Sequence, residues 1–299
     1  MGKQKFNLWK KNVYLSDCIQ IDNLDNQKIT LLNPNDKSVI LYTDKENDRD
    51  MAFSIFKCLP FERAMSYLTC PQHLTFVSPY LWYDPFDYLF YDENKIEGKL
   101  YCFVASYSRA YNEEAVWKSY ANSNTANIWS LDFIKLLEQL SSVSNNNVDF
   151  YVSLIDYSYK KLDLIDIRKQ LNSNPSQPLS LHDVLNNMSL KRKAFKYEDE
   201  IRIFAHVKGE QIPTETKDFK MELLKKSVNG SRNNSSKTLL SKVLLPPYPP
   251  KKKGEFDEIQ YSKLQQIQNR GFRDFYENFD VRIEESRLYV TNENITKLI

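Results

Sequence analysis

Glycine is scarce in this chain, and its scarcity excludes two common nucleotide-binding motifs. Only six glycines occur in 299 residues, and none of them forms a G-x-G-x-x-G or a G-x-x-x-x-G-K pattern. A dinucleotide fingerprint and a phosphate loop both require such glycines, because the backbone must approach the phosphates closely. We therefore expect that any nucleotide is bound without a glycine-rich loop.

The residue types that usually hold metals or form disulfides are also few. The four cysteines show no C-x-x-C spacing, and the three histidines lie far apart in the sequence. A dedicated zinc site is therefore not expected, and neither is a disulfide framework. This cysteine usage fits a reducing environment, so we expect a cytoplasmic location.

Long apolar runs and an excess of one charge are missing as well. No stretch approaches the length of a membrane span, and residues 1–11 lack the apolar segment of a signal peptide. No membrane partner is therefore expected. Lys and Arg number 41 and Asp and Glu number 39, so the net charge of +2 gives no field for unspecific DNA binding. What is present, 41% hydrophobic and 13% aromatic residues, is typical of a folded globular protein.

The order of the expected helices and strands predicts an α+β fold. Residues 1–50 read as short strands and turns, which indicates a small β-rich N-terminal extension. Residues 51–299 mix helices and strands without regular alternation, which predicts a single α+β domain with a mixed, mainly antiparallel sheet and flanking helices. We expect strands at 12–21, 28–32, 38–43, 74–78, 101–106, 149–155, 242–245 and 280–290, and helices at 61–68, 113–120, 131–140, 181–187, 221–227 and 256–270, the last closed by Gly271.

Residues 191–204 form the most informative stretch, because charged and apolar side chains alternate along it. Read as a strand, this stretch places Glu198, Glu200 and Arg202 on one face. Two neighbouring carboxylates tend to raise one pKa, and a guanidinium offsets this, which is how a site tunes a general acid or base. The alternative is a solvated strand face with a surface ion pair, worth about 0–1 kcal/mol.

Four motifs, in this order, resemble the marks of a bacterial family filed as domain-of-unknown-function family 2971. The motifs are YDPFD at 83–87, CF at 102–103, VWKSYA at 116–121 and FKYEDEIR at 195–202, with Lys191 four residues before the last. The resemblance covers about residues 52–290. Two positions depart from the family pattern: Tyr83 stands where asparagine is usual, and Ala126 where glycine is usual.

More distantly, the order of elements resembles the plan of ADP-ribosyltransferases, which bind NAD without a glycine-rich loop. In their arginine-modifying branch an E-x-E motif begins a late strand, and its second glutamate supports the ribose while the bond to nicotinamide breaks. Glu198 and Glu200 have that spacing. This fold-level resemblance implies NAD as the cofactor, no metal, and Glu200 and Glu198 as the catalytic residues.

The same resemblance implies which residues bind NAD. Cations are needed for the pyrophosphate and aromatic rings for the nicotinamide or adenine. The residues that we assign to cofactor binding are Lys57, Arg63, Asp84, Phe86, Trp117, Tyr120, Lys191 and Arg202. Structural alternatives stay open for some of them: Trp117 and Tyr120 have the spacing of a helix core face, Asp84 suits a turn cap, and Arg202 suits a pair with Glu200.

These resemblances imply an NAD-dependent, ADP-ribosyltransferase-like enzyme, in the context of a toxin or a phage-defence effector that modifies a macromolecule or a nucleobase. The alternative is a non-catalytic recognition module whose charged strand binds a protein, a nucleic acid or a phage component. A third reading is a nuclease, in which Glu198, Glu200 and Asp84 converge, although the sequence shows no clear metal cluster.

Overall fold

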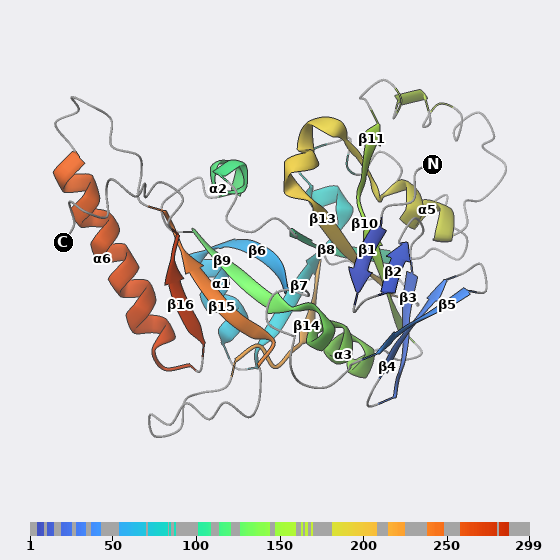
Figure 1. Ribbon diagram of the computed structural model, residues 1–299, viewed down its shortest axis with the longest axis horizontal. Helices are drawn as coiled ribbons and strands as arrows, with labels where there is room; N and C mark the ends of the chain where they lie inside the picture. The colour runs from blue at the N-terminus through green and yellow to red at the C-terminus, as the bar shows by residue number, and fades with distance from the viewer. Residues whose placement is uncertain are drawn as a thin grey trace.

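A twelve-stranded, mainly antiparallel sheet forms the centre of the protein (Figure 1). The computed structural model describes residues 54–69, 71–82, 84, 87, 101–108, 114–120, 126–143, 147–159, 163, 165–166, 169, 181–207, 215–224, 238–247, 258–279 and 281–286, and the backbone of five strands between residues 5 and 42. The predicted α+β class with a mainly antiparallel sheet is confirmed.

The strands and helices have the following bounds. The strands are β1 (Lys5–Leu8), β2 (Lys11–Tyr14), β3 (Ile19–Asp25), β4 (Lys28–Asn33), β5 (Lys37–Tyr42), β6 (Ser54–Pro60), β7 (His73–Val77), β8 (Tyr101–Ser108), β9 (Ala126–Asp132), β10 (Val148–Leu154), β11 (Asp156–Tyr159), β12 (Leu190–Arg192), β13 (Glu200–Val207), β14 (Thr216–Lys220), β15 (Leu240–Leu245) and β16 (Arg282–Glu285). The α-helices are α1 (Phe61–Leu68), α2 (Glu114–Tyr120), α3 (Phe133–Val143), α5 (Leu181–Asn187) and α6 (Glu258–Tyr276), and the 3-10 helices are η1 (Pro79–Leu81) and η2 (Lys193–Glu198).

The sheet forks at β8. The strand order along the main path is β16-β15-β9-β6-β8-β13-β10-β3-β4-β5. In the branch, β7 pairs with β8, and β14 pairs with β7. β13 pairs with β8 along its whole length, but β6 joins β8 only where Phe56 lies opposite Ser108. Glu200, the first residue of β13, also lies opposite Ser108. The start of β13 is therefore at the fork.

The N-terminal strands continue the main sheet. β3 pairs with β10, for example at Phe150 and Ile21, and β4 and β5 follow at that edge. β1 and β2 form a separate two-stranded sheet. In Figure 1 the strands β3–β5 lie at one end of the molecule and α6 lies at the other.

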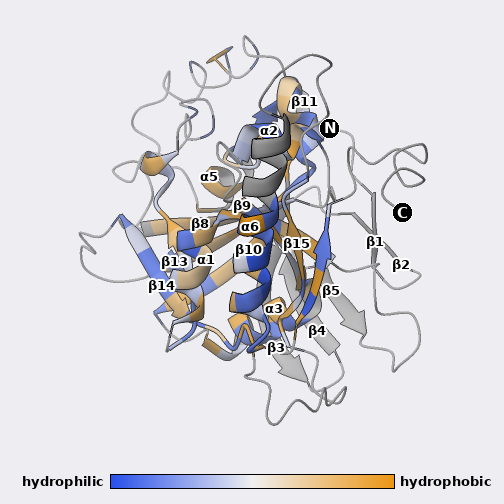
Figure 2. Cartoon of the chain, turned by 90° about the vertical axis from the view of Figure 1, so that its left-hand side faces the viewer, coloured by the Kyte–Doolittle hydropathy of each residue, from blue (hydrophilic) through white to orange (hydrophobic). Residues whose placement is uncertain are grey.

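The central strands are buried on both faces, which explains why they are apolar. Every residue of β13 is buried, as expected for a strand covered on both sides. Figure 2 shows mainly apolar colours on the central strands, whereas the edge strand β14, with the sequence TKDFK, is largely hydrophilic. Helix α1 follows Pro60 and buries Ala64, Tyr67 and Leu68, which share one helix face. Its bounds agree with the predicted helix at 61–68.

Helix α6 extends further than predicted. Gly271 does not close it, since the helix continues to Tyr276. There is also space for a side chain at position 271, because a Cβ there would meet nothing within 4 Å. The added turn is anchored in the core: the ring of Phe272 lies 4.6 Å from that of Phe61, and the Trp129 Nε1–H donates to Tyr276 Oη at 2.9 Å. Tertiary packing therefore overrides the tendency of glycine to end a helix.

The predicted helix at 221–227 is wrong for residues 221–224, which are not helical. Two glutamine side chains hold the backbone of this segment. Gln72 accepts from the Leu224 N–H and donates to the Leu224 carbonyl, both at 2.7 Å. Gln139 makes the same pair of bonds to Glu222 at 2.7 and 3.1 Å. Partners from outside the segment thus replace the bonds that a helix would form.

Candidate functional site

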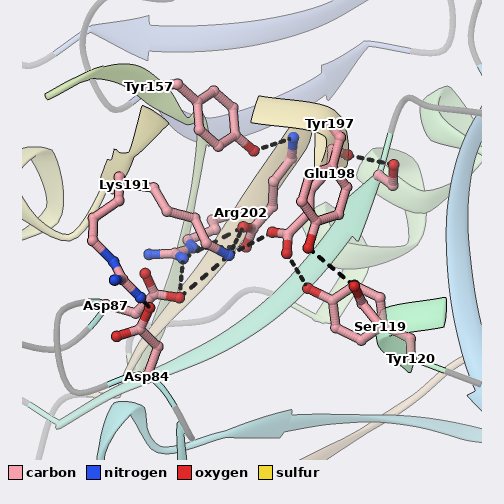
Figure 3. A network of polar contacts seen from close by, with 12 residues as sticks. Asp84, Asp87, Ser119, Tyr120, Tyr157, Lys191, Tyr197, Glu198 and Arg202 are labelled. Atoms are coloured by element: carbon pink, nitrogen blue, oxygen red, sulfur yellow. Dashed lines mark hydrogen bonds and ion pairs between the residues drawn. The ribbon is translucent and has the colours of Figure 1, made fainter. Parts of the chain in front are cut away.

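Five ionisable side chains meet at the start of β13 (Figure 3). We call them the charged cluster: Asp87, Lys191, Glu198, Glu200 and Arg202. Their exposed fractions are 8%, 5%, 4%, 6% and 1%, in that order. The alternative of a solvated strand face is therefore wrong, because a solvated face would expose these charges.

Lys191 links the three carboxylates of the cluster. Its Nζ lies 2.5 Å from Glu198 Oε2, 3.0 Å from Glu200 Oε2 and 3.3 Å from Asp87 Oδ2. An ammonium group has three N–H donors. The ammonium thus has one carboxylate partner for each proton, and it holds Glu198 and Glu200 next to each other.

Arg202 forms the second cationic centre. Its Nε lies 2.7 Å from Glu200 Oε1, and its Nη2 lies 3.1 Å from Asp87 Oδ2. The remaining Nη1 donates to the Met188 carbonyl at 2.5 Å, and the guanidinium carbon lies 4.3 Å from the centre of the Trp82 ring. The predicted pair of Arg202 and Glu200 is confirmed as part of this larger network.

A turn, rather than a continuous strand, brings the cluster together. Lys191 belongs to β12, residues 193–198 form the 3-10 helix η2, and β13 begins only at Glu200. The prediction of one strand over residues 191–204 is therefore wrong at 193–198. Asp199 connects the two elements with φ 42° and ψ 56°, a left-handed conformation that aspartate tolerates better than most residues. This reversal folds Glu198 back toward Lys191.

The two glutamates have environments that shift their pKa values in opposite directions. Burial alone would raise the pKa of Glu200, but the charges of Arg202 and Lys191 outweigh burial and lower it to about 2. Burial raises the pKa of Glu198; the charge of Lys191 opposes this shift and that of Glu200 adds to it. Burial also raises the pKa of Asp87. The cluster has three carboxylates for two cations, so one carboxylate charge is in excess.

Helix α2 covers the Glu198 side of the cluster. The Tyr120 hydroxyl donates to Glu198 Oε1 at 2.6 Å, and the hydroxyls of Ser119 and Tyr197 lie 3.0 Å apart. The Tyr120 side chain is nevertheless 47% exposed. Burial and the Glu198 charge raise the pKa of Tyr120, so the phenol keeps its proton. Trp117, by contrast, is buried in an apolar cluster that includes Ile128.

Two further cations, Lys57 and Arg63, lie close enough for their charges to interact, and the charge of Glu200 also acts on Lys57. The half-buried Lys57 of β6 donates to the Ser106 carbonyl at 3.1 Å, and its ammonium lies 4.7 Å from the centre of the Tyr107 ring. Ser106 in turn bonds to Glu200 through its side chain. Loss of hydration and the nearby charge of Arg63 lower the pKa of Lys57 to about 8. Arg63 itself is exposed on α1.

The remaining predicted residues occupy different places. Asp84 forms an ion pair with Arg192 at the edge of the cluster, and Phe86 lies outside the described residues. Ala126, which stands where the resembled motif pattern usually has glycine, is buried at the start of β9. Of the predicted site residues, Glu198, Glu200, Lys191 and Arg202 are therefore in direct contact, Tyr120 touches them through Glu198, and Trp117 belongs to the core.

Sequence reasoning missed several residues of the site. Asp87 closes the YDPFD motif but was not assigned a role. Ser108 donates its hydroxyl to the Glu198 carbonyl, and Tyr157 accepts the Glu200 N–H at 2.8 Å. Their partners lie far away in the sequence, so no local spacing could have identified them. Only Asp87 could have been identified from the sequence, because it is the second acidic residue of the YDPFD motif.

Comparison with known proteins gives no relative for this arrangement: no protein-family model, no curated protein and no solved structure matches the chain. Among the described residues, no group of three or more His, Cys, Asp or Glu side chains could hold a metal ion. The described helices also include none that is long and apolar enough to cross a membrane.

Proposed function

We propose that the charged cluster cleaves the bond between ribose and nicotinamide in NAD and transfers the ADP-ribosyl group to an acceptor. The observation that carries this proposal is the pairing of Glu198 and Glu200 on one lysine, with pKa values shifted apart. Such a separation is typical of two carboxylates with different acid–base roles. The distant resemblance to ADP-ribosyltransferases and membership of family 2971 are parts of this proposal.

Glu200 supplies the negative charge that the reaction requires. Departure of nicotinamide leaves positive charge on the ribose, and a fixed carboxylate beside it lowers the energy of that state. Glu200 is ionised at neutral pH because its pKa is about 2. Lys191 and Arg202 keep its two oxygens in place, so little reorganisation is needed during the reaction.

Glu198 acts as the acid–base group for the acceptor. A general base works best when its pKa lies near the operating pH, and burial moves the pKa of Glu198 upward. Its Oε1 faces Tyr120, the half-exposed residue of the site. An acceptor that approaches from solvent on this side therefore meets Glu198 before Glu200.

Lys57 and Arg63 bind the pyrophosphate in this proposal. Lys191 and Arg202 are occupied by carboxylates, so they have little capacity for a further anion. Lys57 and Arg63 lie close enough for their charges to repel, and the charge of Glu200 offsets only part of this effect on Lys57. A bound anion would relieve this repulsion and raise the pKa of Lys57. A pair of this kind fits the phosphates of a nucleotide.

NAD titration tests the proposal. We expect binding heat, a rise of the melting temperature with NAD concentration, and release of nicotinamide. Glu200→Gln is expected to abolish release, whereas the control Glu114→Gln, which breaks the exposed pair with Lys118 on α2, is expected to leave it unchanged. Denaturation of each variant separates loss of chemistry from loss of fold. Absence of heat and of a thermal shift at millimolar NAD would refute the proposal.

A recognition module is the second candidate, and the saturation of the cluster favours it. Each cation of the cluster has carboxylate partners, and the two glutamates expose only 4% and 6% of their surface. In this candidate the network has a purely structural role, which is to fix α2, η2 and the start of β13. This candidate predicts no response to NAD, and it predicts that Glu200→Gln weakens partner binding only as far as it unfolds the protein.

A further inference from the structure

A ligand could bind Glu198 at Oε1 only by replacing the Tyr120 hydroxyl, because Lys191 holds the other oxygen. Its Oε2 is bound by Lys191 at 2.5 Å inside the cluster, and Ser108 occupies its main-chain carbonyl. Its Oε1 receives the Tyr120 hydroxyl at 2.6 Å, and this is the contact on the side of the half-exposed residue. A ligand that reaches Glu198 from solvent therefore finds a single acceptor atom.

One acceptor atom suits a hydroxyl group better than a guanidinium group. A guanidinium binds a carboxylate most strongly with two parallel N–H bonds, which require both oxygens. At Glu198 a guanidinium that bound both oxygens would have to share Oε2 with the buried Lys191 ammonium, and the two like charges would repel each other. The E-x-E motif alone suggests an arginine acceptor, but the contact of Lys191 with Glu198 Oε2 favours a hydroxyl over a guanidinium.

Tyr120 shows that a hydroxyl fits this place. Its phenol makes the single bond that the geometry allows, while 47% of its surface is exposed. Helix α2 does not depend on this bond alone, since Trp117 is buried in the core and Ser119 contacts Tyr197. The Tyr120 side chain can therefore be displaced while the helix stays in place.

We infer that the acceptor of the transfer is a hydroxyl group, which displaces the Tyr120 phenol and binds Glu198 Oε1. This inference rests on the proposed function. In the reaction the acceptor oxygen forms a bond to the anomeric carbon of the ribose, and the bond from that carbon to the nicotinamide nitrogen breaks. Nicotinamide leaves as a neutral molecule, and Glu198 takes the hydroxyl proton and then passes it to water.

The test compares two variants that each remove one hydroxyl from α2. Tyr120→Phe frees Glu198 Oε1, whereas Ser119→Ala removes the neighbouring contact to Tyr197 and leaves Glu198 untouched. Both are incubated with NAD and one of three acceptors: a serine peptide, the same peptide with arginine in place of serine, and a short RNA with free hydroxyls. Nicotinamide release and product mass are measured, and melting temperatures verify that the variants fold.

The serine peptide and the RNA both carry hydroxyl groups, so we expect transfer to at least one of them. We expect no transfer to the arginine peptide. Tyr120→Phe should lower the KM for the hydroxyl acceptor about tenfold or more, because the acceptor no longer competes with a bond to a charged group. Ser119→Ala should leave the KM as it is. Transfer to the arginine peptide, or an unchanged KM for Tyr120→Phe, would overturn the inference while the proposed function stands. If no protein releases nicotinamide with any acceptor, both are overturned.

Discussion

Two regions of this molecule contain ion pairs of similar length in opposite surroundings. In the charged cluster, Arg202 Nε lies 2.7 Å from Glu200 Oε1, and the side chains are 1% and 6% exposed. At the edge of the sheet, Arg273 Nη2 lies 2.9 Å from Glu285 Oε1, with side chains 44% and 34% exposed. Distance therefore does not separate the two regions, but burial does.

The comparison shows which ion pairs can be functional. An exposed pair is screened by water and salt, so it contributes only about 0–1 kcal/mol to stability. In a buried network each charge depends on its partners, and removal of one partner leaves the others uncompensated. In the cluster these dependences shift the pKa of Glu198 upward and that of Glu200 downward.

The largest difference between the two regions should appear on loss of an arginine. Arg202→Met leaves Glu200 and Asp87 without their common guanidinium, so the free energy of unfolding should fall by about 3–5 kcal/mol. Arg282→Met, which removes a 76% exposed partner of Glu284, should change it by less than about 1 kcal/mol. Urea denaturation of both variants measures the difference. Equal effects would show that the cluster behaves as a surface network.

The pH dependence of stability should show the next largest effect. Because the pKa of Glu200 falls from 4.5 to about 2 on folding, its stabilisation is present above pH 4.5 and is lost as the pH falls toward 2. Between neutral pH and pH 3 the wild type should lose about 2 kcal/mol more than Glu200→Gln. Glu198 has a raised pKa, so its contribution has the opposite sign and is lost as the pH rises above 4.5.

Glu198→Gln supplies the control for this pH experiment. The stability of the wild type relative to Glu198→Gln should decrease with rising pH, while its stability relative to Glu200→Gln should increase between pH 2 and 4.5. Chemical denaturation at a series of pH values gives both difference curves. Two curves of the same sign would mean that the environments of the two glutamates are not distinct.

Elements with strong local signals could be predicted from the sequence. The helices at 61–68 and 181–187 have the predicted bounds. The alternation along β13 correctly placed Glu200 and Arg202 on one side, as their 2.7 Å contact shows. Both successes depend on residues within a few positions of each other.

The remainder of the site depends on partners that are distant in the sequence. Residues 193–198 read as a strand by alternation but form η2, where Ser108 and α2 hold Tyr197 and Glu198 from outside. The predicted helix at 131–140 begins only at Phe133, because residues 126–132 form β9 between β6 and β15. Local pattern does not reveal these pairings, since they are set by the register of the whole sheet.

The smallest effect that we predict concerns salt at the sheet edge. Arg273→Met should lower the free energy of unfolding by less than about 1 kcal/mol at low salt, and this loss should shrink further in 1 M NaCl, where the Debye length is about 3 Å. The effect of Arg202→Met should persist at high salt, because ions do not enter a cluster whose members are at most 8% exposed. Denaturation of both variants at low and high salt measures the two effects. If salt reduced them in the same proportion, the charged cluster would be open to solvent, and its glutamates would lack the shielded environment on which the proposed chemistry depends.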